Sequence, residues 1–147
     1  MIQSANINHL KQVLDIEKKV FFRPWTHNQL KMDLSGFKDV ENLVYVVDGE
    51  VIGYVLGDFI LDEFHLNNIA VKKEFQSNKI GRLLMENLLY RLKNKKINKI
   101  YLEVSNNNTP AKKLYESIGF QQYSIRKNYY SKGEHALLLI MKMKNYG

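Results

Sequence analysis

Apolar and polar residues alternate along the chain with two different periods, and each period predicts a different element. Apolar positions three or four residues apart predict helices over residues 9–20, 79–94 and 109–118. Thr26 is a good N-cap for a further short helix that ends near residue 34. Runs typical of β-strands cover residues 43–47, 51–61, 65–71, 99–104, 120–130 and 136–143, after a weak first strand near residues 2–7.

The connections between these runs predict how the strands pair. Asp48-Gly49 between two apolar runs is a strong hairpin signal, so residues 43–71 are expected to form an antiparallel meander of three strands. The next helix and strand imply a right-handed crossover and a locally parallel pair. Before the last helix, Thr109 is expected as the N-cap, with Pro110 in the first helical position. A chain of 147 residues fits a single α/β domain, 1–147.

The clearest chemical signal lies where the strand that ends at Val71 passes through a polar turn into a helix. Such a turn presents backbone N–H groups and the positive end of the helix dipole, which together bind phosphate well. A phosphorylated ligand is one interpretation of this stretch. An ordinary strand-to-helix turn is the other, and these residues alone favour neither.

Composition excludes several kinds of chemistry. The chain has no cysteine, which excludes disulfides, thiolate metal sites and a cysteine nucleophile. Its four histidines lack the spacing of metal ligands, so no metal is expected. With neither a signal peptide nor an apolar run of membrane length, we expect a cytoplasmic protein without a membrane partner.

The formal net charge of +7 would suit a nucleic-acid partner. However, the lysines are scattered, except over residues 93–99, where a helix should end and cations are favoured. A solvated helix end is therefore the preferred interpretation, and no direct nucleic-acid binding is required. A cofactor with several phosphates would also be attracted to a positive surface.

Two further positions have both a structural and a functional interpretation. Glu103 lies in an otherwise apolar strand, on the face opposite Leu102 and Val104. It is either an exposed edge glutamate or a partly buried general base. Trp25, in the break between the first two helices, either belongs to the core or lines a substrate groove.

The turn after Val71 resembles a known motif. Gln76-x-x-Lys79-x-Gly81-Arg82 is similar to the acyl-CoA-binding motif Gln/Arg-x-x-Gly-x-Gly/Ala of the GNAT superfamily of N-acetyltransferases. Lys79 replaces the first glycine, and its Cβ costs roughly 1 kcal/mol if that position is left-handed. Its charge beside the phosphates could offset this cost. The cofactor contacts that the resemblance implies are Ile69, Ala70, Val71, Gln76, Ser77, Asn78, Lys79, Ile80, Gly81 and Arg82.

A second stretch is similar to one branch of that superfamily, the RimI-type N-terminal alanine acetyltransferases. The similar runs are Tyr101-Leu102-Glu103-Val104-x-x-x-Asn108, Ala111-x-x-Leu114-Tyr115-Glu116-Ser117-Ile118-Gly119-Phe120, Ile125-Arg126-Lys127-Asn128-Tyr129-Tyr130 and Pro24-Trp25-Thr26.

The resemblance implies a role for each matching residue. Glu103 would be the general base, Tyr115 the general acid and Asn108 a cofactor contact. A packed core tyrosine and a turn-forming asparagine remain the alternatives for the last two. Trp25, Tyr129 and Tyr130 would shape the acceptor site, although packing on neighbours accounts for the two tyrosines equally well.

The resemblance also implies a fold and a reaction. The fold would be a mixed, mostly antiparallel sheet of about seven strands with about four helices, whose central strands part to admit acyl-CoA. The reaction would be direct acetyl transfer from acetyl-CoA to the N-terminal alanine of a small-subunit ribosomal protein. Transfer to a lysine side chain or a small amine is one alternative. A non-catalytic acyl-CoA-binding or ribosome-binding module is another.

Overall fold

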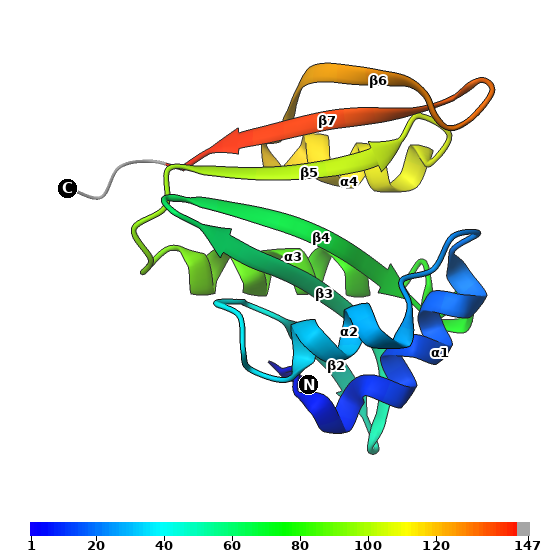
Figure 1. Cartoon of the computed structure of the whole chain (residues 1–147), viewed down its shortest axis with the longest axis vertical. Helices are drawn as coiled ribbons and strands as arrows, with labels where there is room; N and C mark the ends of the chain where they lie inside the picture. Colours follow the sequence, from blue (N-terminus) through cyan, green and yellow to red (C-terminus); the bar gives the residue numbers. More distant parts are fainter. Residues whose placement is uncertain (144–147) are drawn as a thin grey trace. The chain divides into compact units, whose positions relative to one another are not determined.

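The computed structural model describes residues 1–143, which form a mixed α/β fold around one seven-stranded sheet (Figure 1). The strands follow the order β1-β2-β3-β4-β5-β7-β6. They are β1 (Ile2–Ser4), β2 (Leu43–Val47), β3 (Glu50–Ile60), β4 (Glu63–Val71), β5 (Lys99–Ser105), β6 (Gln121–Ser131) and β7 (Glu134–Lys142). The helices are α1 (Leu10–Val20), α2 (His27–Leu34), α3 (Ile80–Leu92) and α4 (Thr109–Ile118), with 3-10 turns η1 (Ile7–His9) and η2 (Lys73–Phe75). The expected fold class is confirmed.

Two compact units divide these elements. Unit 1 consists of residues 1–59 and 67–95, and unit 2 consists of residues 60–66 and, among the described residues, 96–143. Strand β4 contributes its first part to unit 2 and its second part to unit 1. The prediction of a single domain over 1–147 stays a prediction.

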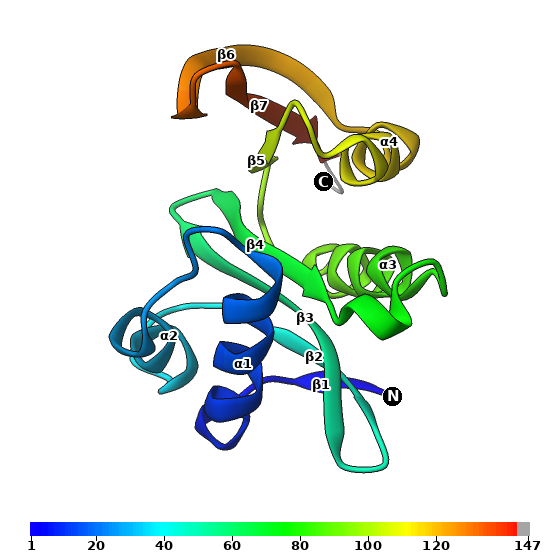
Figure 2. The same ribbon diagram turned by 90° about the vertical axis from the view of Figure 1, so that its right-hand side faces the viewer.

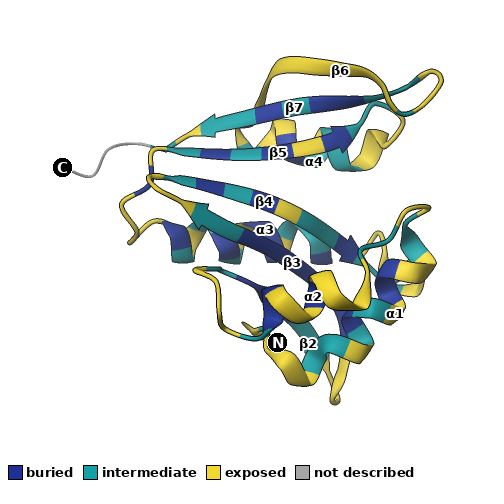
Figure 3. Cartoon of the chain, viewed as in Figure 1, coloured by how far each residue is buried: buried dark blue, intermediate teal, exposed yellow. Residues whose placement is uncertain are grey.

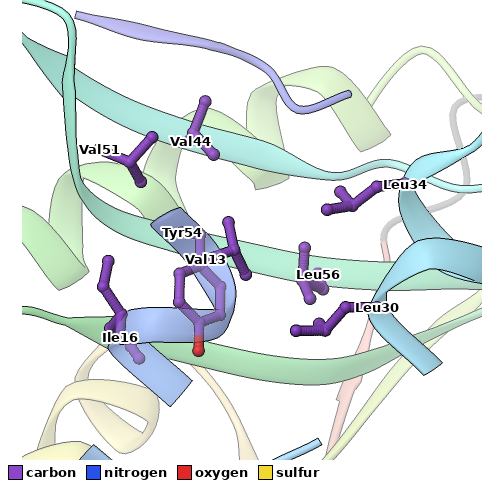
Figure 4. Packing of buried hydrophobic residues seen from close by; sticks show 9 residues of the cluster. Val13, Ile16, Leu30, Leu34, Val44, Val51, Tyr54 and Leu56 are labelled. Carbon is purple, nitrogen blue, oxygen red and sulfur yellow. The ribbon is translucent and has the colours of Figure 1, made fainter. Parts of the chain in front are cut away.

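In unit 1, helices cover both faces of the strands. Helices α1 and α2 lie on one face and α3 lies on the other (Figures 1 and 2). The core between α1, α2 and the sheet includes Val13, Leu30 and Tyr54, none of which is exposed to solvent. Figure 4 shows the ring of Tyr54 lying beside Val13 and Ile16 of α1. The apolar face of α1 therefore packs into the same core as Tyr54 of β3.

The predicted hairpin between β2 and β3 is confirmed. Asp48 and Gly49 form its turn and both have positive φ angles, 49° and 79°. This is the backbone combination for which Asp-Gly is favoured in two-residue hairpin loops. The two strands pair antiparallel, with a register shift between Tyr45 and Val46.

In unit 2, β7 lies between β5 and β6 and pairs antiparallel with both. The first residues of β4 pair with β5 in parallel, from Glu63 with Lys99 to His65 with Tyr101, which confirms the predicted parallel pair. Along β5 every second residue is buried, including Leu102 and Val104 (Figure 3). The intervening Glu103 therefore lies on the opposite face of the strand.

One predicted helix start is wrong. The N-cap of α4 is Asn108 rather than Thr109, because the Asn108 Oδ1 accepts a hydrogen bond from the Ala111 N–H at 3.3 Å. Thr109 is the first helical residue, and Pro110 follows it within the first turn. The other start is confirmed, since the Thr26 hydroxyl accepts from the Gln29 N–H and caps α2.

Candidate active site

In unit 1 the strand–turn–helix segment has the predicted course. Strand β4 ends at Val71, η2 occupies the turn, and α3 begins at Ile80. The Gln76 side chain closes the turn, because its Nε2 donates to the carbonyl oxygen of Val71 at 3.0 Å. Gln76 thereby ties the turn to the end of the strand, a structural role that the motif alone does not reveal.

Lys79 adopts the left-handed conformation that the motif's first glycine would favour. Its φ and ψ angles are 61° and 20°, and it is the N-cap residue of α3. Its side chain makes no capping hydrogen bond, whereas Thr26 and Asn108 cap α2 and α4. The first N–H groups of an α-helix have no acceptor within the helix. The start of α3 therefore presents donors and a positive dipole end to an anion.

A glycine lets the segment approach the sheet closely. A Cβ atom on Gly53 of β3 would lie 3.1 Å from the carbonyl oxygen of Ala70 and 3.3 Å from a methyl group of Leu84. Only a residue without a side chain fits here without displacing β4 or α3. Gly53 therefore supports the Ile69-Ala70-Val71 stretch that the resemblance assigns to the cofactor.

In unit 2 the proposed base has a cationic neighbour. The Glu103 side chain is 37% exposed, and its Oε1 lies 3.5 Å from Nη1 of Arg126 on β6. The Arg126 guanidinium also lies 5.2 Å from the ring centroid of Tyr129. β5 pairs with β4 only as far as Tyr101, so at Glu103 the paired neighbour is Leu138 of β7. Glu103 is a solvent-accessible carboxylate at this point of β5.

Tyr129 and Tyr130 lie in the same region as Glu103. Their rings meet edge to face with centroids 5.3 Å apart. Burial, followed by the negative charge of Glu103, raises the pKa of Tyr130 to about 12. Unit 2 thus gathers a carboxylate, a guanidinium and two tyrosines, which suit polar recognition and proton transfer.

Tyr115 has a different environment, on α4. Its side chain is only 4% exposed, and its ring packs edge to face on Phe120 with centroids 6.0 Å apart. Burial raises the pKa of its hydroxyl, so Tyr115 is protonated at neutral pH. A protonated phenol can act as an acid, and the packing on Phe120 also agrees with a structural role. Asn108 is likewise occupied structurally, as the cap of α4.

Sequence reasoning missed two residues, one in each unit. No local pattern predicts the contact of Arg126 with Glu103. For Glu17 a signal exists, because it occupies a core-facing position of α1 beside the apolar Val13 and Ile16. Its carboxylate accepts the backbone N–H of Trp25 at 2.9 Å. Trp25 itself is half-buried and packs against the core of unit 1.

Within the described part of the chain, residues 1–143, no group of three or more acidic, histidine or cysteine side chains is arranged to hold a metal ion. Over the same residues, no helix is long and apolar enough to cross a membrane.

Comparison with known proteins extends the similarity over almost the whole chain. Residues 10–120 match the acetyltransferase (GNAT) family. A Salmonella typhimurium ribosomal protein bS18-alanine N-acetyltransferase is 37% identical over 143 residues, which are 97% of this chain and 95% of that protein. The Haemophilus influenzae protein of the same name is 35% identical over 122 residues, 83% of this chain and 82% of that one. The crystal structure of the ribosomal-protein-S18-alanine N-acetyltransferase from Escherichia coli has a TM-score of 0.92 and 29% identity, and covers 100% of this chain and 96% of that chain.

Proposed function

The chain belongs to the acetyltransferase (GNAT) family, and we propose that it transfers the acetyl group of acetyl-CoA to the N-terminal alanine of ribosomal protein bS18. The observation that carries this acceptor is the 37% identity with the Salmonella typhimurium enzyme over 97% of the chain. In this proposal residues 1–147 act as one N-acetyltransferase domain. A ribosomal acceptor would place the protein in the cytoplasm.

Unit 1 would hold the cofactor through the segment from β4 to α3. The backbone amides of residues 77–81 and the positive end of the α3 dipole would bind the diphosphate of acetyl-CoA. Lys79 would add a full positive charge beside it. The side chain of the N-cap residue, Lys79, accepts no hydrogen bond from the first N–H groups of α3. A bound phosphate would accept from these N–H groups, which supports the assignment. Asn108 is proposed as a further cofactor contact.

Unit 2 would supply the proton transfers. A protein α-amine has a pKa of about 8, so at neutral pH it must lose a proton before its nitrogen can attack. Glu103 would accept this proton directly or through a water molecule. Its accessible position on β5 supports the role, because a general base must reach the proton that it accepts. The Arg126 guanidinium, 3.5 Å from Oε1, adds a positive charge that opposes a second cation at the site.

The nitrogen lone pair would then attack the thioester carbon. The negative charge that develops on the thioester oxygen would be stabilised by a backbone N–H of β4, at Val71 or a neighbouring residue. As the tetrahedral intermediate collapses, the carbon–sulfur bond breaks and the thiolate takes a proton from Tyr115. Because the chain has no cysteine, no cysteinyl acyl-enzyme can form, and the acetyl group passes directly to the amine in a ternary complex.

Trp25, Tyr129 and Tyr130 are proposed to contact the acceptor. In this edge-to-face pair Tyr129 is exposed and Tyr130 is partly buried, and accessible tyrosines offer both an apolar face and a hydrogen-bonding hydroxyl to a peptide. The guanidinium of Arg126 lies over the Tyr129 ring, in the range of a cation–π contact.

The test is thiol release from acetyl-CoA in the presence of a short alanine-started peptide with the bS18 N-terminal sequence. The same peptide with an acetylated N-terminus is the control. Release only with the free α-amine would support the proposal. Thiol release in the presence of lysine-containing peptides or small amines, but not in the presence of the peptide with a free α-amine, would contradict the proposed acceptor. CoA binding without any release would contradict the proposed catalysis.

A further inference from the structure

A buried carboxylate in unit 1 has no part in the proposed chemistry. Glu17 of α1 is completely inaccessible to solvent. Its neighbours on the same side of the helix are the apolar Val13, Ile16 and Val20, none of which can form a hydrogen bond with the carboxylate through its side chain. Removing a carboxylate from water is costly unless donors in the protein replace the lost hydration. Such a position therefore needs a full set of hydrogen bonds.

Three neutral donors supply these bonds. Glu17 Oε2 accepts the backbone N–H of Trp25 at 2.9 Å, and Oε1 accepts the Tyr54 hydroxyl at 2.5 Å. The Nδ2 of Asn68 also donates to Oε1. Burial raises the pKa of Glu17, while its three hydrogen bonds act in the opposite direction. The donors come from the segment after α1, from β3 and from β4, so one side chain joins three parts of unit 1.

Two of these parts belong to the proposed site. Trp25 is a proposed acceptor contact, and Asn68 directly precedes the Ile69-Ala70-Val71 stretch proposed to bind the acetyl end of the cofactor. Asn68 is itself fixed on the strand, because its Oδ1 accepts the Ile69 N–H at 3.0 Å. The hydrogen bonds therefore run without a break from the Trp25 backbone through Glu17 to the backbone of β4.

We propose that Glu17 is a positioning residue for the transfer reaction, holding the acceptor-side segment at Trp25 against β4 in unit 1. The inference rests on the proposed function, since it assumes that Trp25 contacts the acceptor. Glu17 would not touch either substrate. It would act by keeping the Trp25 segment in one place, so that the acceptor amine is presented to the thioester at a constant distance.

The main variant is Glu17→Gln, which keeps the size of the side chain. A glutamine has one acceptor oxygen, while the three donors occupy both oxygens of Glu17, so at least one donor is left without its bond. We expect kcat/KM for the alanine-started peptide to fall about tenfold, through a higher peptide KM. A fall of this size corresponds to the loss of one hydrogen bond to a charged group. The affinity for acetyl-CoA should stay within about twofold of the wild-type value, because this variant leaves the α3 turn unchanged.

A matched control and a rescue separate positioning from a general loss of stability. Asp33 of α2 is also a buried carboxylate of unit 1, but it pairs with Lys38 at 3.1 Å. We expect Asp33→Asn to lower the melting temperature and to leave kcat/KM for the peptide unchanged. Adding Asn68→Asp to Glu17→Gln exchanges amide and carboxylate, so that the amide on α1 can donate to the carboxylate on β4. Recovery of at least about threefold of kcat/KM is expected.

Trp25 is the only tryptophan of the chain, so its fluorescence reports on this segment without any assay of activity. Acrylamide should quench Trp25 more strongly in Glu17→Gln than in the wild type or in Asp33→Asn, because a released segment is more accessible. Unchanged quenching together with unchanged peptide KM would overturn the inference. A parallel loss of peptide and acetyl-CoA affinity in both variants would also overturn it. Absence of transfer by the wild type would instead overturn the proposed function.

Discussion

The left-handed backbone at Lys79 leads to a prediction that separates strain from charge. Lys79→Ala removes the charge and keeps a Cβ atom at a φ of 61°, whereas Lys79→Gly removes both. A Cβ atom in this conformation costs about 1–2 kcal/mol in the folded protein. Glycine in turn lowers the free energy of unfolding by about 0.4–1 kcal/mol, because it gives the unfolded chain more conformational entropy. The glycine variant should therefore be about 0.5–1 kcal/mol more stable than the alanine variant.

This difference is measurable by chemical denaturation and by melting. For a protein of this size it corresponds to about 1–4 °C in melting temperature. If Lys79→Gly were instead the less stable variant by about 0.5 kcal/mol, only the entropy penalty would remain, and the left-handed conformation of this residue in solution would be refuted.

The same two variants test the charge. Both lack the ammonium group, so both should bind acetyl-CoA about threefold more weakly than the wild type at low salt, as for one exposed ion pair. The loss should shrink as the salt concentration rises, because salt screens exposed charges. Isothermal titration at two salt concentrations measures this. Wild-type affinity in both variants at low salt would refute the contact between Lys79 and the phosphates.

Three other predictions concern single residues. Glu103→Gln should lower kcat at least about 100-fold while CoA binding stays intact, and unaltered turnover would exclude Glu103 as the base. Gly53→Ala should cost about 1–3 kcal/mol in the free energy of unfolding, since the new Cβ meets the Ala70 carbonyl oxygen at 3.1 Å; a neutral effect in urea denaturation would show that β4 can move away. The raised pKa of Tyr115 gives a pH dependence. Above about pH 10 the phenol ionises in the unfolded chain but keeps its proton in the folded one, so stability falls by up to about 1.4 kcal/mol per pH unit. Tyr115→Phe should lessen that fall in melts between about pH 9 and pH 11, and an identical slope in both proteins would contradict the burial of the hydroxyl.

Local patterns were sufficient to predict most elements, because hydrophobic period, caps and turn residues act over a few positions. The hairpin at Asp48-Gly49 and the cap at Thr26 are examples, and both are confirmed. The start of α4 shows the limit of such reasoning. Asn108 and Thr109 are both good N-caps, and propensity alone does not choose between them. In the structure the Asn108 oxygen reaches the Ala111 N–H, which places Pro110 inside the first turn.

The neighbours of Glu103 depend on pairing that no short stretch encodes. Glu103 of β5 lies opposite Leu138 of β7, and Leu138 lies opposite Ser124 of β6. A register shift between Gln122 and Ser124 then helps to set which residue of β6 comes near the carboxylate. Because a slip of one residue would reverse the faces of β6, the contact with Arg126 follows only from the full three-strand register.

Glu17 illustrates a signal that a sequence does contain but that is easily passed over. A carboxylate at a core-facing position of an otherwise apolar helix stripe is costly, so the fold must compensate it with donors or lose stability. The periodicity reveals the anomaly, but it cannot name the donors, which lie 8, 37 and 51 residues away along the chain. If the Glu17→Gln variant releases Trp25 and raises only the peptide KM, the cost of burying this charge has a functional reason, because the same hydrogen bonds that satisfy the carboxylate also hold the acceptor side of the site.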